Sequence, residues 1–87
     1  MDIRTRFLAT VTSHFGVIET READPLDAVV RRDLKPDSLD LIELAVAIED
    51  EFAIELTDDE LAAMPSQTTL REIMGLVEGK LPGRIAA

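Results

Sequence analysis

The sequence predicts an all-α protein, a small four-helix bundle with a long loop between the first and second helices and a short third helix. Apolar residues recur at helical spacing in three segments of the chain. Hydrophobic residues make up 46% of the composition and three phenylalanines are the only aromatic residues, which indicates an aliphatic core. The 87 residues suffice for one domain, so we assign 1–87 to a single domain with a loose tail at about 83–87.

The first helix is expected to begin after Asp2, which can cap it, and to end at Gly16. Its apolar stripe recurs every four residues and consists of Ile3, Phe7, Val11 and Phe15. Residues 17–37 then form a connection longer than the usual limit of about 15 residues, which indicates a functional segment or one ordered by short turns. We expect its apolar side chains to fix it onto the bundle: Val17, Ile18, Leu26, Val29, Val30 and Leu34.

The central helix is expected to begin at Asp37 or Ser38, because the proline at 36 disfavours helix before it, and to run to Phe52. Helical geometry sorts its apolar residues into two stripes. The core stripe contains Leu41, Leu44, Ala45, Ile48 and Phe52. The second, narrower stripe contains Leu39, Ile42 and Val46, and it is bordered by Asp40, Glu43, Glu49 and Asp50. An apolar strip in an acidic frame indicates a docking surface, and burial inside the bundle is the equally weighted alternative.

Two capping boxes mark the remaining helices. Thr57 and Glu60 predict a short third helix over 58–64 that stops before Pro65. Thr69 and Glu72 predict the start of the last helix, whose core stripe is Leu70, Ile73, Met74, Val77 and Leu81. Leu81-Pro82-Gly83 should end it.

Ser38 places a primary hydroxyl at the start of the central helix. Backbone N–H groups are unpaired there and the helix dipole favours negative charge, so a phosphate ester on the hydroxyl would be accommodated. The alternative is that Asp37 and Ser38 are simply good helix caps. The position therefore makes Ser38 a candidate modified serine.

Charge is distributed very unevenly. Residues 36–70 contain ten acidic residues and no Lys, Arg or His, and the net charge of the chain is −9. A phosphate backbone would be repelled, so we exclude nucleic acid and expect basic protein partners. The chain has no cysteine, so any thioester chemistry requires an imported thiol. The acidic residues lack the spacing of an EF-hand loop, and no metal site is expected.

No catalytic constellation is recognisable. His14 is the only histidine and should be a surface or edge residue. The residues around Ser38 do not form the G-x-S-x-G turn of a serine hydrolase, so we expect a protein that is not an enzyme. No apolar run approaches the ~20 residues that span a membrane and no signal peptide is visible. We expect a cytoplasmic monomer without membrane insertion.

Several short motifs occur in a fixed order along the chain: Asp33-Leu34, Asp37-Ser38-Leu39-Asp40, Ile42-Glu43-Leu44, Ile48-Glu49-Asp50-Glu51-Phe52 and Ile54-Glu55-Leu56. Together they resemble the acyl carrier protein family. The resemblance implies a 4′-phosphopantetheine arm from coenzyme A on Ser38, within Asp37-Ser38-Leu39. It implies two kinds of partner, a phosphopantetheinyl transferase and acyl-transferring or acyl-modifying enzymes. Their basic patches would meet Asp37, Asp40, Glu43, Val46, Glu49 and Asp50, beside Ile42.

The chain departs from the family pattern before the serine. The family usually has glycine two residues before Asp-Ser-Leu, and Lys35 followed by Pro36 occupies this stretch, so we expect negative φ at both residues. Lys35 also brings a cation close to the presumed phosphate. Val30 stands where the family often has phenylalanine. These differences favour a specialised carrier over a housekeeping one, and fatty-acid, polyketide and specialised lipid pathways remain open. A peptidyl or aminoacyl carrier and a non-covalent acidic helical adaptor are the alternatives.

Overall fold

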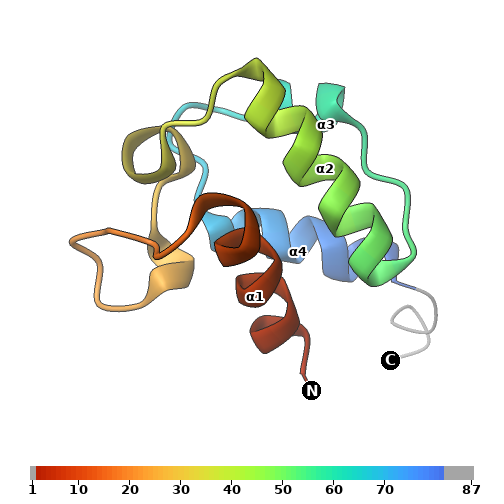
Figure 1. The fold of residues 1–87 in the computed structure, drawn as a ribbon, viewed down its shortest axis with the longest axis horizontal. Helices are drawn as coiled ribbons and strands as arrows, with labels where there is room; N and C mark the ends of the chain where they lie inside the picture. Colours follow the sequence, from red (N-terminus) through yellow and green to blue (C-terminus); the bar gives the residue numbers. More distant parts are fainter. Residues whose placement is uncertain (1, 82–87) are drawn as a thin grey trace.

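The computed structural model describes residues 2–81, which form four α-helices and two short helical turns (Figure 1). The all-α bundle is confirmed, and the loose tail expected at 83–87 lies outside the described residues. The elements are α1 (Ile3–Phe15), the 3₁₀ turn η1 (Pro25–Asp27), the π-helical turn η2 (Val30–Leu34), α2 (Ser38–Phe52), α3 (Asp58–Ala62) and α4 (Leu70–Lys80).

Side-chain caps fix the helix starts as the sequence predicts. Asp2 accepts a hydrogen bond from the Thr5 N–H at 2.7 Å, and both threonine capping boxes form at α3 and α4. The third helix is shorter than the predicted 58–64, because the chain tightens after Ala62. There the Met64 N–H donates to the Leu61 carbonyl, a three-residue turn that ends the helix before the proline at 65.

The helices pack around one aliphatic core. α1 packs against α2 and α4, α3 against α2, and η1 against α4, and Figure 1 shows α2 crossing above α1 and α4. Most of the predicted core stripe of α2 is buried, and only Leu41 is partly exposed. The buried apolar residues include Phe7, Val11, Leu44, Ala45, Ile48, Phe52, Leu56, Leu61, Leu70, Ile73 and Val77.

Backbone pairing and buried side chains order the 17–37 connection. The Val30 N–H donates to the Thr68 carbonyl at 3.0 Å, and the Leu70 N–H donates to the Ala28 carbonyl at 3.0 Å. Of the predicted anchors, Leu26, Val29 and Val30 are buried, whereas Ile18 and Leu34 are partly buried. Val17 is 84% exposed, so its prediction as an anchor is wrong.

The physical reason for the exposure of Val17 lies in the preceding residue. Gly16 ends α1 with a φ of 80°, a left-handed value that turns the chain away from the helix before Val17. The connection packs against the core again at Ile18 and is held by ion pairs at Asp24. This residue caps η1 and pairs with Arg4 of α1 at 2.8 Å and with Arg71 of α4 at 3.2 Å. The Arg4 hydrogen bond is the main reason why the pKa of Asp24 falls to about 2.

Asp33 organises the part of the connection that leads to Ser38. Its side chain is 10% exposed and accepts hydrogen bonds from the Thr20 hydroxyl at 2.7 Å and from the Val29 N–H at 3.0 Å. Arg32 pairs with it and also with Glu22. The Arg32 guanidinium is the main cause that holds the pKa of Asp33 far below its ordinary value. This network of charged hydrogen bonds fixes η2 in place.

The prediction of a negative φ at Lys35 is wrong. Lys35 has a φ of 51° and a ψ of 53°, whereas Pro36 keeps a negative φ. Lys35 closes η2, because its N–H donates to the Val30 carbonyl at 3.1 Å, and the left-handed conformation reverses the chain there. The family glycine that Lys35 replaces would adopt this conformation without strain.

Candidate functional site

Ser38 is the first residue of α2 and is exposed. Asp37 caps the helix: its carboxylate accepts from the Asp40 N–H at 2.8 Å, and the Asp40 carboxylate accepts from the Asp37 N–H at 3.0 Å. Within residues 2–81, the N–H groups of Ser38 and Leu39 have no hydrogen-bond acceptor. The serine hydroxyl therefore stands beside two free donors at the positive end of a helix.

His14 contacts this cap from the last turn of α1. Its Nε2 lies 3.4 Å from Asp40 Oδ1, and its ring meets Phe15 edge to face with centroids 4.6 Å apart. The pKa of Asp40 is lowered, chiefly by the hydrogen bond from the Asp37 N–H and secondarily by His14. His14 is the edge residue that the sequence predicts, but nothing in the sequence signals its contact with Asp40.

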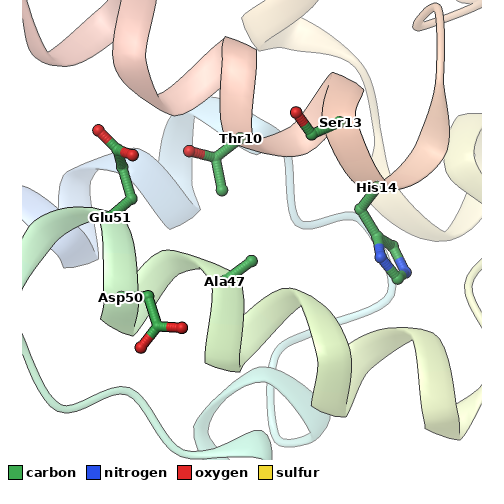
Figure 2. A pocket seen from close by; sticks show the side chains of 6 residues that line it. All are labelled: Thr10, Ser13, His14, Ala47, Asp50 and Glu51. Atoms are coloured by element: carbon green, nitrogen blue, oxygen red, sulfur yellow. The ribbon is translucent and has the colours of Figure 1, made fainter.

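A groove of about 380 Å³ runs between α1 and α2. Figure 2 shows Thr10, Ser13 and His14 of α1 opposite Ala47, Asp50 and Glu51 of α2. Ser13 and His14 point in different directions, and no hydrogen bond in the described part of the chain joins a serine hydroxyl to the imidazole. Because no serine hydroxyl is bonded to His14, the described residues contain no Ser-His-Asp hydrogen-bond chain.

The second apolar stripe of α2 is exposed, which resolves the choice between core and surface. Leu39 is 61%, Ile42 43% and Val46 49% exposed. A shallow hollow of about 220 Å³ lies beside the stripe, between α2 and the connection to α3, and it is lined by Ile42, Ala45, Val46, Glu49, Leu56 and Thr57. The stripe therefore gives α2 an exposed apolar strip that begins next to Ser38, and the hollow beside it has a mixed apolar and polar lining.

The acidic frame of the stripe separates into two groups. Glu43 and Asp50 are exposed. Asp40 and Glu49 are partly buried and are used inside the protein, Asp40 in the capping box and Glu49 as the acceptor of the Leu56 N–H at 3.1 Å. Only the first group presents an unoccupied carboxylate to a partner, a distinction that the sequence pattern did not give.

A small apolar cavity lies between η2, α2, α3 and α4. Its volume is about 20 Å³, room for about one water molecule. Arg31 is the only charged residue in its lining, and its Nη2 lies 3.5 Å from the Ala62 carbonyl oxygen at the end of α3. Sequence reasoning missed Arg31, because a π-helical turn is not visible in a hydrophobic pattern. The lining comprises Val30, Arg31, Pro36, Leu41, Leu61, Met64, Pro65, Thr68 and Ile73.

The described residues contain neither a metal-binding cluster nor a membrane-spanning helix. No group of three or more His, Cys, Asp or Glu side chains between residues 2 and 81 has an arrangement that could hold a metal ion. None of the helices in this range has the length and apolar character needed to cross a membrane.

Comparison with known proteins gives a consistent result. A family model described as a phosphopantetheine attachment site matches residues 9–77. Acyl carrier protein 2 of Pseudomonas aeruginosa is 35% identical over 82 residues, which cover 93% of this chain and 96% of the relative. Acyl carrier protein 3 of Ralstonia nicotianae is 43% identical over 54 residues, 62% of this chain and 59% of the relative.

The acyl carrier protein of Buchnera aphidicola is 32% identical over 73 residues, 84% of this chain and 91% of the relative. No solved structure gives a significant match. The cofactor of such proteins is 4′-phosphopantetheine, in agreement with the description of the family model. Since that model covers most of the chain and two of these relatives align over nearly their whole length, the chain belongs to the acyl carrier protein family.

Proposed function

We propose that the protein carries acyl groups as thioesters on a 4′-phosphopantetheine arm attached to the Ser38 hydroxyl. The observation that carries the proposal is the position of Ser38, exposed at the first turn of α2 within the segment that matches the attachment-site family. The thiol at the end of the arm supplies the nucleophile that holds the acyl group, and the chain itself has no cysteine that could do so.

The surroundings of Ser38 fit a phosphodiester. The unpaired N–H groups of Ser38 and Leu39 can donate to its oxygens, and the helix dipole favours its negative charge. The carboxylates of Asp37 and Asp40 already accept backbone hydrogen bonds within the cap. An exposed hydroxyl also leaves room for the arm.

The surface of α2 would then present the loaded arm to partner enzymes. Ile42 and Val46 offer apolar contact area beside a shallow hollow, while the exposed carboxylates of Glu43 and Asp50 attract lysine and arginine side chains. A phosphopantetheinyl transferase and acyl-handling enzymes with basic patches are the partners that this surface suits. Surface charges raise association rates more than affinity, so these encounters should be brief and sensitive to salt.

The cavity favours acyl over aminoacyl cargo, because its lining is aliphatic except for Arg31 and Thr68. The cavity volume of about 20 Å³ is too small for a hydrocarbon chain, so an acyl chain could enter only if the wall of the cavity moves. We expect α3 to be the moving part of the wall, because it is a short helix of five residues and the flexible side chain of Met64 follows it in the lining. Fatty-acid, polyketide and specialised lipid pathways all use such cargo.

Intact mass spectrometry tests the attachment. The wild type, Ser38→Ala and the control Ser13→Ala, which alters another exposed serine, would be incubated with coenzyme A and a permissive phosphopantetheinyl transferase. The wild type and Ser13→Ala should gain the mass of one phosphopantetheine, and Ser38→Ala should gain none. A folded wild type that gains no mass would overturn the proposal, and the non-covalent adaptor would replace it.

A further inference from the structure

The basic residues of the described part of the chain are nearly all neutralised by carboxylates. Residues 2–81 contain eight of the nine Lys and Arg residues, and six of these eight form ion pairs. The two that do not are Arg31 and Lys35. Both lie on η2 or at its end, in the segment that leads directly to Ser38. The cations without an ion pair in the described chain are therefore both in the segment that precedes the serine.

Arg31 is held only loosely. Its single hydrogen bond, from Nη2 to the Ala62 carbonyl, is 3.5 Å long, whereas charge-assisted hydrogen bonds of this kind usually measure about 2.7–2.9 Å. Four of the five N–H donors of its guanidinium have no acceptor in the described residues. It lines the cavity together with Pro36 and with Leu41, which lies one turn into α2 from Ser38. The guanidinium can therefore turn toward an anion on the serine at little cost.

Lys35 occupies a position where its backbone is strained. A left-handed conformation is unfavourable for an L-residue, whereas glycine would fit here without strain. Residues held in such conformations are concentrated at functional sites. Lys35 lies three positions before Ser38, at most about 11 Å of backbone away, and the lysine side chain is long and flexible. A lysine ammonium can span this distance to a group on the serine.

We propose that Arg31 and Lys35 form an anion clamp for the phosphodiester that joins the arm to Ser38. This inference rests on the proposed attachment. The two cations bind the single negative charge of the phosphodiester and offset its repulsion from the acidic segment 36–70. Because Arg31 also lines the cavity, the clamp holds the first atoms of the arm near the mouth of the cavity, and so near the place where an acyl chain would enter.

A thermodynamic cycle tests the clamp. Urea unfolding would be measured for the unmodified and the phosphopantetheinylated forms of the wild type, Arg31→Gln, Lys35→Gln and Arg21→Gln. Arg21 is a matched control, an exposed arginine of the same connection that does not line the cavity and whose Nε lies 3.8 Å from Glu22. Intact mass would first show that each sample is fully modified.

At low salt, modification should stabilise the wild type more than either clamp variant, by about two- to fivefold in the unfolding equilibrium constant. This difference should disappear at about 1 M salt, where charges are screened beyond about 3 Å, and Arg21→Gln should behave like the wild type. If Arg31→Gln and Lys35→Gln shift both forms equally, the clamp is refuted while the attachment stands. If the mass of the wild type does not change, the attachment itself fails and the clamp with it.

Discussion

Replacing Lys35 by glycine should stabilise the unmodified protein. Lys35 has a φ of 51° and a ψ of 53°, a conformation that costs an L-residue about 1–2 kcal/mol. Glycine removes this cost but loses about 0.5–1 kcal/mol more backbone entropy on folding. The hydrogen bond from the residue 35 N–H to the Val30 carbonyl is kept, since glycine also has this donor. The net gain should be about 0.5–1 kcal/mol in the free energy of unfolding.

Urea unfolding followed by circular dichroism measures this gain. With an m-value of about 1 kcal/mol/M, the urea midpoint should rise by about 0.5–1 M. Lys35→Ala is the matched control, because alanine also lacks the charge but keeps a Cβ and hence the strain. Its midpoint should stay close to that of the wild type.

Two results would refute this reasoning. Equal stabilisation by glycine and alanine would show that the lysine charge, and not the backbone, is responsible. Destabilisation by glycine would show that residue 35 does not adopt a left-handed conformation in solution. The unmodified protein is used so that no phosphodiester contributes to the comparison.

Three further predictions concern charge, core and surface. Arg4 holds the folded-state pKa of Asp24 near 2, below the ordinary 3.8. The ionised Asp24 carboxylate therefore stabilises the folded protein above about pH 4, and this stabilisation is lost as the pH falls toward 2. The stability difference between wild type and Asp24→Asn should therefore shrink between pH 5 and pH 2.5 in urea titrations, and a constant difference would contradict it. Leu44→Ala, at a fully buried site, should cost about 2–5 kcal/mol by the same assay, whereas a loss below about 1 kcal/mol would place Leu44 outside the core. Val46→Asp should lower the kcat/KM of a phosphopantetheinyl transferase by about fivefold or more, whereas Val17→Asp, at another exposed valine, should not, and equal effects would exclude docking at Val46.

The helices could be predicted from the sequence because their signals are local. Asp2, Thr57 and Thr69 cap their helices as the sequence indicates, since a cap depends on residues three or four positions apart. The exposed stripe of α2 follows from the same periodicity. Its exposure could not be decided from the pattern, because it depends on whether α3 covers Ile42 and Val46, and α3 leaves both exposed.

The connection before Ser38 was predicted least well, because its structure depends on long-range pairing. Residues 28–30 bond to the backbone of 68–70, a contact between segments forty residues apart that no local pattern encodes. This pairing holds the start of η2, and η2 in turn requires the left-handed turn at Lys35. A rule based on proline alone therefore predicted the wrong sign for the φ of Lys35.

The partition of charge would allow one acidic surface to receive both the proposed anionic arm and the proposed basic partners. Asp37, Asp40 and Glu49 accept backbone hydrogen bonds within the protein, so the carboxylates left for partners on α2 are those of Glu43 and Asp50, beyond the first turn of the helix. The unpaired cations Arg31 and Lys35 and the free N–H groups of Ser38 and Leu39 lie at the other end of this surface, in or before the first turn of α2. A partner with a basic patch would thus be attracted to the part of α2 beyond its first turn and repelled near Arg31 and Lys35. Such a gradient of charge along α2 would orient the partner on the helix and keep the partner's cations away from the phosphodiester. The arm would then stay bound to the carrier until the acyl group is transferred.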